Sequence, residues 1–177
     1  MRILLAAILS AALIGPAAAD SARDLIGKTY QVETTPEGAV NVGIDYTRGG
    51  YGVISPGRTI PATGSFPSYR IETLSDDRGI SIIVAARPSA RLSPTVEEWL
   101  VTGVAESAKV SSDSNLSYTC PGNSDTASPV QFVYYDNQPK GRILKKVADG
   151  FLLDRASGRL TVAPKPAQGC KATEDPL

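Results

Sequence analysis

The sequence predicts a mainly β protein: an antiparallel meander that forms a small barrel or a strongly curved sheet or sandwich, with at most one short helix. Short runs of alternating apolar and polar residues recur along the chain, and turn formers separate them. The 177 residues include 16 Gly and 13 Pro, which favours short elements over long helices. A barrel is favoured over an open sheet because about ten strands in an open sheet would leave exposed edges.

The first residues resemble a secretory signal peptide. Arg2 supplies a positive charge, Ile3–Ile14 form an uncharged apolar run, and small residues precede a cleavage site before Asp20. The apolar run is too short to span a membrane, so we expect an exported chain, periplasmic or secreted, without a transmembrane anchor. The expected organisation is a cleaved signal peptide over 1–19, a single β domain over 20–163 and a Pro-rich C-terminal tail over 164–177.

Two turns organise the beginning of the predicted domain. Lys28–Thr34 and Val40–Tyr46 alternate apolar and polar residues around Pro36-Glu37-Gly38, which predicts a first hairpin. Arg48-Gly49-Gly50 predicts a second tight turn before a strand over Tyr51–Ser55, because glycine adopts the positive φ that such turns require.

A long loop and another hairpin follow. Pro56–Pro67 is rich in proline and glycine and is predicted to be a loop. Ser68–Leu74 and Gly79–Ala86 predict a hairpin around Asp76-Asp77-Arg78-Gly79, since the β-branched residues at 80, 82 and 84 share one face of a strand.

One segment has a helical pattern. Over Ser93–Val104, apolar residues and one glycine recur at i, i+3, i+4, i+7 and i+8 from Val96. Thr95 and Glu98 fit a capping box, so we predict a short helix here. A strand over Glu98–Ala105 is the alternative.

The C-terminal part predicts a meander, since short turns join its strands. The predicted strands are Pro129–Asp136, Arg142–Ala148, Phe151–Asp154 and Arg159–Ala163, with turns at 138–141, Asp149-Gly150 and 156–158. Lys145 and Lys146 would point to opposite faces of their strand. Tyr134 and Tyr135 would do the same, one facing inward and the other outward.

Cys120 and Cys170 are the only cysteines. In an exported chain such a pair predicts a disulfide, which would join the Pro-rich tail to the β domain. A redox-active pair would need a closer spacing, such as Cys-x-x-Cys, and two cysteines without histidine are too few for a typical zinc site. We therefore expect neither a metal nor a cofactor.

The chain contains no histidine, which excludes Ser-His-Asp and Cys-His catalysis and an imidazole general base. It has neither a phosphate-binding loop nor a dinucleotide fingerprint. Its 18 basic and 18 acidic residues balance, so no large field attracts nucleic acid. We expect a non-enzymatic protein that binds a small apolar ligand or another envelope or extracellular protein.

Paired carboxylates leave one enzymatic alternative, a histidine-independent hydrolase of the glycosidase type. The candidates are Asp45, Asp76, Asp77, Glu97 and Glu98. A structural role is favoured for these residues, because aspartates in turns bond to their own backbone and glutamates suit a helix N-terminus.

Tyr46, Arg48 and Tyr51 form a candidate binding cluster. A four-residue hairpin loop would place the two tyrosines opposite each other, with the arginine at the tip, where the group could grip a partner. The alternative is an aromatic pair that only closes the hairpin. Trp99 is expected to lie in the core.

Two short segments resemble the C-type lysozyme inhibitors of the bacterial envelope. Tyr118-Thr119-Cys120 precedes a predicted strand pair, and Ala156-Ser157-Gly158-Arg159 follows. Members of that family are small exported barrels that insert a serine and a basic residue into the cleft of lysozyme. The resemblance implies that Ser157 and Arg159 are the inserted pair and that the two cysteines hold the barrel. An inhibitor is therefore an alternative function.

Overall fold

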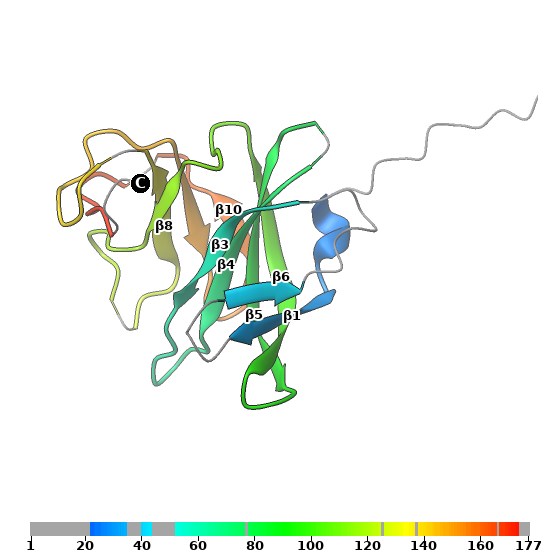
Figure 1. Cartoon of the computed structure of the whole chain (residues 1–177). Helices are drawn as coiled ribbons and strands as arrows, with labels where there is room; N and C mark the ends of the chain where they lie inside the picture. The colour runs from blue at the N-terminus through cyan, green and yellow to red at the C-terminus, as the bar shows by residue number, and fades with distance from the viewer. Residues whose placement is uncertain are drawn as a thin grey trace, which may run out of the picture.

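The computed structural model describes residues 22–34, 40–43, 52–76, 78–124, 126–136, 138–165 and 167–173. Within these ranges the chain forms two antiparallel sheets and one 3-10 turn, η1 (Ala22–Leu25). The larger sheet is curled into a half-barrel (Figure 1), which confirms the predicted mainly β, strongly curved fold. The expected signal peptide lies outside the described residues. No helix in the described ranges is long and apolar enough to cross a membrane.

The curled sheet has six strands in the order β2-β1-β6-β5-β4-β3. Their bounds are Thr29–Thr34 (β1), Val40–Gly43 (β2), Gly52–Ile60 (β3), Tyr69–Ser75 (β4), Ser81–Arg91 (β5) and Val96–Ser107 (β6). The predicted hairpins β1–β2 and β4–β5 are confirmed. β2 and β3 are the two edge strands at opposite ends of this order, so their described residues do not pair with each other.

The smaller sheet has four strands in the order β10-β9-β8-β7. Their bounds are Asn115–Ser117 (β7), Val130–Tyr135 (β8), Asp149–Leu153 (β9) and Leu160–Val162 (β10). Three of these strands were predicted near these positions, and β8, β9 and β10 follow one another as a meander. β7 adds to the outer edge of β8.

The helix predicted over Ser93–Val104 is wrong, and the alternative of a strand is confirmed. β6 occupies the segment, and burial alternates along it: Trp99, Val101 and Gly103 are buried, while the residues between them are partly exposed. Trp99 pairs with Tyr30 of β1 and lies in the core, as expected. Pairing with β1 on one side and β5 on the other outweighs the local helical spacing.

The loop predicted over Pro56–Pro67 is also partly wrong, since β3 continues to Ile60. The register between β3 and β4 shifts between Ser55 and Arg58, and β3 is an edge strand. A proline has no N–H to donate, so edge strands and bulges are the positions where a sheet tolerates it.

The strand predicted over Arg142–Ala148 is wrong as well. This segment makes a single bridge, between Ile143 and Lys171, and lies outside both sheets. Its partner is the C-terminal tail rather than the next strand. Lys145 and Lys146 are both exposed, so neither faces inward.

Asp149-Gly150 begins β9 instead of forming the predicted turn. The buried carboxylate of Asp149 accepts a hydrogen bond from Ser107 Oγ of the curled sheet at 2.8 Å. This hydrogen bond between the two sheets gives the buried Asp149 carboxylate a partner. The local sequence had predicted a turn at Asp149 instead.

Three apolar clusters hold the structure together. One lies between the sheets, where the rings of Phe132 and Phe151 stack with their centroids 5.4 Å apart. Another covers the opposite face of the curled sheet and includes Trp99. The third packs behind the smaller sheet and contains Tyr135 and the disulfide. Tyr134 and Tyr135 do point to opposite faces, but both are buried, so the outward tyrosine that was predicted is covered.

An ion pair is buried on the face of the curled sheet that points away from the smaller sheet. Arg70 Nε donates to Glu72 Oε1, and both side chains are buried. A Cβ on Gly57 would overlap the Glu72 carboxylate, so the glycine in the β3 bulge makes room for it. Burial raises the pKa of Glu72, and the charge of Arg70 opposes this rise.

The two sheets also meet where β6 packs against the turn between β9 and β10. Thr102 Oγ1 donates to the carbonyl oxygens of Ala85 and Gly158, each at 3.1 Å. Gly158 has a φ of 76°, which favours glycine. Gly103 faces the backbone of the same turn with no side chain between them.

Gly103→Ala is expected to lower the free energy of unfolding by about 1–3 kcal/mol, as overpacking does elsewhere. The added Cβ would lie 2.6 Å from the Gly158 carbonyl oxygen and 2.7 Å from Leu160 N. Chemical denaturation measures the change. Gly64→Ala is the matched control, since its Cβ meets nothing within 4 Å. Equal stability of Gly103→Ala and the wild type would contradict this close packing.

Candidate functional site

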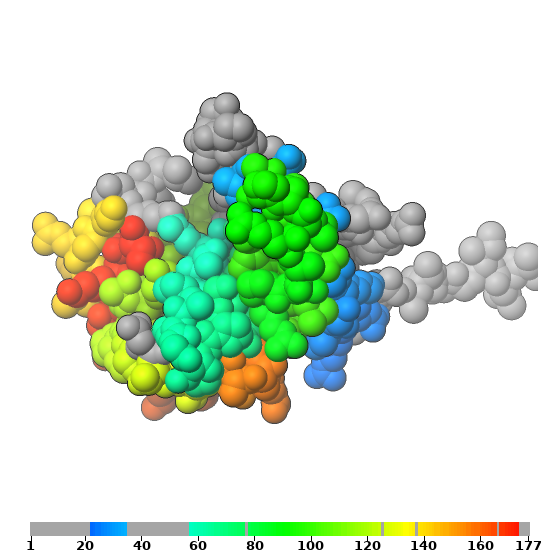
Figure 2. Space-filling view, turned by 90° about the horizontal axis from the view of Figure 1, so that it is seen from below, coloured from blue at the N-terminus to red at the C-terminus, as the bar shows by residue number. Residues whose placement is uncertain are grey.

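A groove of about 240 Å³ opens where four segments from the two sheets meet. Its lining consists of Ile60, Pro61 and Thr63 at the end of β3, residues 118–120 with Asn123 and Ser124 after β7, and Val130 and Arg155 from the smaller sheet. Figure 2 shows the teal, yellow-green and orange segments that carry these residues side by side, seen from below. The groove therefore depends on how the two sheets are joined.

Arg155 is the one charged residue among the described residues of this lining. Its side chain is buried, with 2% of the residue exposed. Nη2 donates to the carbonyl oxygen of Pro61 at 2.8 Å, and the guanidinium carbon lies 5.1 Å from the ring centroid of Phe66. Nε is buried without a hydrogen-bond partner. Within the described ranges no carboxylate forms an ion pair with this guanidinium.

The neighbouring carboxylate, that of Asp154, accepts hydrogen bonds from its own turn and from Ser128. Oδ2 accepts from Ser157 Oγ at 2.7 Å, and Oδ1 accepts from Ala156 N and Ser128 Oγ, each at 3.0 Å. These hydrogen bonds, that of Ser157 first, hold the pKa of Asp154 below its usual value. Asp154 therefore stabilises the turn as an anion and does not neutralise Arg155.

The backbone of Arg155 is fixed from two sides. Tyr69 OH of β4 donates to its carbonyl oxygen at 2.9 Å, and its N–H donates to Ser128 Oγ at 3.0 Å. Burial raises the pKa of Tyr69, so its hydroxyl keeps its proton and remains a donor at neutral pH. The position of the guanidinium is thus set by residues distant in the sequence.

Asn123 holds the opposite wall. Its Nδ2 donates to the carbonyl oxygens of Tyr118 and Gln131, each at 2.6 Å, and its Oδ1 accepts from Gln131 N at 2.9 Å. Cys120 in the same wall forms the predicted disulfide with Cys170, which attaches the tail to the domain. Both contacts limit the movement of residues 118–124, so the wall is preformed.

The rest of the lining is neutral. Ile60, Pro61 and Val130 are apolar, and hydroxyl groups supply the remaining polar character. Thr63 Oγ1, like Arg155 Nε, is buried without a hydrogen-bond partner. The described residues of the lining include no carboxylate that could act as a general base.

Ser157 and Arg159 lie in the same turn as Arg155, and both are exposed. Ser157 Oγ donates to Asp154 and accepts from Arg159 N at 3.2 Å, so it has a local structural role. The other predicted binding residues, Tyr46, Arg48 and Tyr51, lie outside the described residues.

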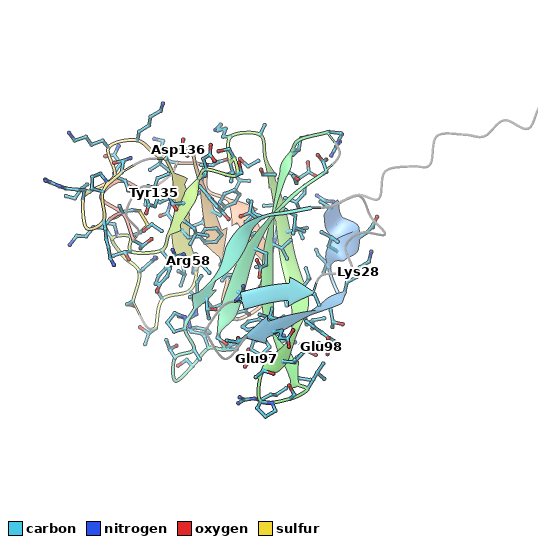
Figure 3. The ribbon with its side chains drawn as sticks, viewed as in Figure 1. Lys28, Arg58, Glu97, Glu98, Tyr135 and Asp136 are labelled. Carbon is cyan, nitrogen blue, oxygen red and sulfur yellow. A yellow bond between two sulfur atoms is a disulfide. The ribbon has the colours of Figure 1, made fainter. Side chains whose placement is uncertain are left out.

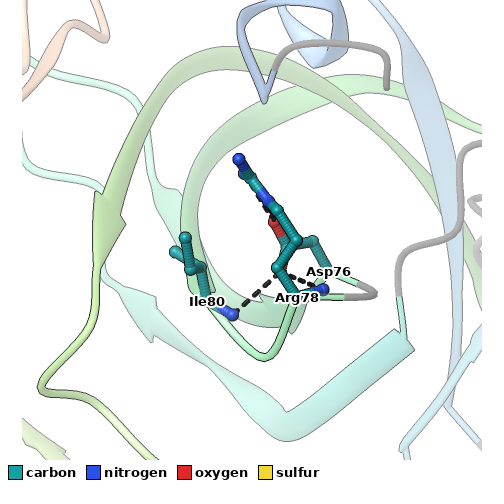
Figure 4. Close-up of polar contacts among 3 residues, drawn as sticks. All are labelled: Asp76, Arg78 and Ile80. Atoms are coloured by element: carbon teal, nitrogen blue, oxygen red, sulfur yellow. Dashed lines mark hydrogen bonds and ion pairs between the residues drawn. The ribbon is translucent and has the colours of Figure 1, made fainter. Parts of the chain in front are cut away.

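Of the candidate carboxylates, the structure describes Asp76, Glu97 and Glu98, and it places Asp76 apart from the two glutamates. Asp76 caps the β4–β5 turn: its Oδ1 accepts from Arg78 N at 3.0 Å and from Ile80 N at 2.8 Å (Figure 4). Glu97 and Glu98 lie on β6, opposite the far end of β5 (Figure 3). Asp45 and Asp77 lie outside the described residues. Within the described ranges no cluster of three or more acidic or cysteine residues could hold a metal ion.

Sequence reasoning missed Arg155, Thr63 and Asn123. An arginine in a predicted surface turn is ordinarily solvent-exposed, so nothing in its immediate surroundings marks it. The spacing from Asp154 to Ser157 was the one sequence pattern that pointed to this site. It is typical of a turn in which the aspartate carboxylate accepts hydrogen bonds from the turn itself. The burial of the neighbouring Arg155 depends on residues far away in the sequence, Pro61, Tyr69 and Ser128.

Asn123→Ala is expected to lower the free energy of unfolding by about 1–3 kcal/mol and to speed amide exchange at Gln131, whose N–H loses its acceptor. Chemical denaturation and hydrogen exchange measure both effects. Asn115→Ala is the matched control, since the Asn115 side chain makes no hydrogen bond within the described ranges. Unchanged exchange at Gln131 would show that Asn123 does not hold this wall.

Among the described residues, the groove is thus preformed and has one buried cation, otherwise neutral walls and two buried polar atoms without a hydrogen-bond partner. Its interpretation rests on this geometry. Comparison of the chain with protein-family models, with curated proteins and with solved structures finds no match.

Proposed function

We propose that the protein is an exported, non-enzymatic binding protein that holds a small organic molecule in the groove between its two sheets. The observation that carries the proposal is the pair of buried polar atoms, Thr63 Oγ1 and Arg155 Nε, that have no hydrogen-bond partner among the described residues and belong to residues lining the same groove. Buried polar groups are nearly always hydrogen-bonded, and a bound molecule is one source of the missing partners.

The size and lining of the groove support a compact ligand. Its volume of about 240 Å³ lies below the range of about 300–1,000 Å³ that is typical of sites for drug-sized molecules. Ile60 and Val130 offer apolar contacts, and the hydroxyl groups offer hydrogen bonds. Walls that are fixed before binding reduce the entropy that a ligand must overcome.

The disulfide supports export. Cys120 and Cys170 are 50 positions apart, and bonds of this kind persist in oxidising compartments. A periplasmic or secreted protein would meet small molecules from outside the cell, which agrees with a binding function.

An inhibitor of lysozyme is the second candidate. The exposure of Ser157 and Arg159 on one turn favours it, because an inserted pair must project from the surface. A lysozyme inhibition assay with the mature protein, and with Ser157→Ala and Arg159→Ala, separates this candidate from a small-molecule binder. Inhibition that both variants abolish would favour the inhibitor.

The binding proposal is tested by recording amide NMR spectra of the wild type during a screen of small neutral, anionic and cationic organic molecules. We expect ligands that shift the amides of Thr119, Asn123 and Gln131, which lie in or beside the groove. Ser124→Trp places a bulky ring at the exposed rim and is expected to remove these shifts.

Ser112→Trp is the matched control. Ser112 and Ser124 are both exposed serines in loops with one weak hydrogen bond of 3.4 Å, but Ser112 is not part of the groove. Its spectra should show the same ligand-induced shifts as the wild type. A screen that yields no ligand at the groove, or shifts that survive in Ser124→Trp, would overturn the proposed function.

A further inference from the structure

We infer that the ligand of this groove carries a carboxylate group and that this group pairs with the guanidinium of Arg155. The inference rests on the proposed function, since it names the chemical class of ligand for the same groove. It follows from the charge balance around one residue.

The positive charge of Arg155 has no counterion among the described residues. Its contacts are the carbonyl oxygen of Pro61 and the ring of Phe66, which are both neutral. An arginine side chain stays protonated in proteins, so burial cannot remove its charge. A buried charge without a partner is costly, and an anion in the groove would offset that cost.

No other described group competes for this role. Asp154 directs both carboxylate oxygens to Ser157, Ala156 and Ser128. The remaining residues of the lining are uncharged. An anionic ligand would therefore supply the counterion that Arg155 lacks among the described residues.

The charge and the lining of the groove favour a carboxylate over a phosphate. The lining contains one cation, which balances a single negative charge, whereas a phosphate dianion would leave a second charge among neutral residues. The planar guanidinium matches the two oxygens of a carboxylate. The apolar side chains of Ile60 and Val130 fit the hydrocarbon part of a small organic acid rather than a free inorganic ion.

Benzoate tests the inference, with benzamide as its neutral counterpart of nearly equal shape. In NMR titrations of the wild type, benzoate should bind at least about tenfold more tightly than benzamide, as expected for a hydrogen bond to a charged group. Arg155→Gln should lower the affinity for benzoate by at least about tenfold. The affinity for benzamide should stay within about threefold, because the walls are unchanged. Arg142→Gln, which removes an exposed arginine outside the groove, should bind both probes like the wild type.

Arg155→Lys guards against misfolding of the glutamine variant. It keeps the positive charge but loses the planar fork, so its affinity for benzoate should lie between those of the wild type and Arg155→Gln. Melting temperatures establish that each variant is folded before its titration is interpreted. If Arg155→Gln does not fold, the ratio of benzoate to benzamide affinity in the wild type and in Arg155→Lys decides the question.

Three results would overturn the carboxylate assignment: equal affinity of the wild type for the two probes, unchanged benzoate binding by Arg155→Gln, or no benzoate binding at millimolar concentration. In each case, neutral or cationic ligands found at the groove in the wider screen would leave the proposed function intact. A failure of every class of ligand would remove both proposals together.

Discussion

The turn between β9 and β10 is held against the curled sheet by three contacts, one with β4 and two with β6. Tyr69 of β4 donates to the carbonyl oxygen of Arg155, and Thr102 of β6 donates to that of Gly158. Gly103 allows the backbone of β6 to approach the same turn without an intervening side chain. These contacts fix the smaller sheet on the larger one, and the apolar cluster between the sheets fills the space that the approach encloses.

The groove follows from this junction. Because the turn is tied down, the side chain of Arg155 lies beneath the loop after β3 and bonds to Pro61 instead of reaching solvent. Asp154 accepts hydrogen bonds from the turn itself, so the guanidinium has no counterion among the residues that the structure describes. On the opposite wall, the hydrogen bonds of Asn123 and the Cys120–Cys170 disulfide fix residues 118–124 to the smaller sheet and the tail. The contacts that hold the turn in place thus also bury the Arg155 guanidinium to which we assign ligand binding.

Local patterns in the sequence predicted the features that depend on local contacts. The β4–β5 hairpin and its Asp76 cap belong to this group, since the turn and its hydrogen bonds lie within a few residues. β6 and Asp149 were misassigned because their partners are distant: two flanking strands in one case and Ser107 in the other. The burial of Arg155 was not predicted for the same reason. It depends on Tyr69 and Pro61, which lie 86 and 94 positions away from Arg155 in the sequence.

Native mass spectrometry of the mature protein, purified from its source without denaturation, tests the central claim most directly. If the groove at Arg155 is the ligand site, the oxidised wild type should retain one small anionic organic molecule, and Ser124→Trp produced in the same way should carry none. A bare wild type, or a bound molecule that remains on Ser124→Trp, would contradict the claim that the groove at Arg155 is the ligand site.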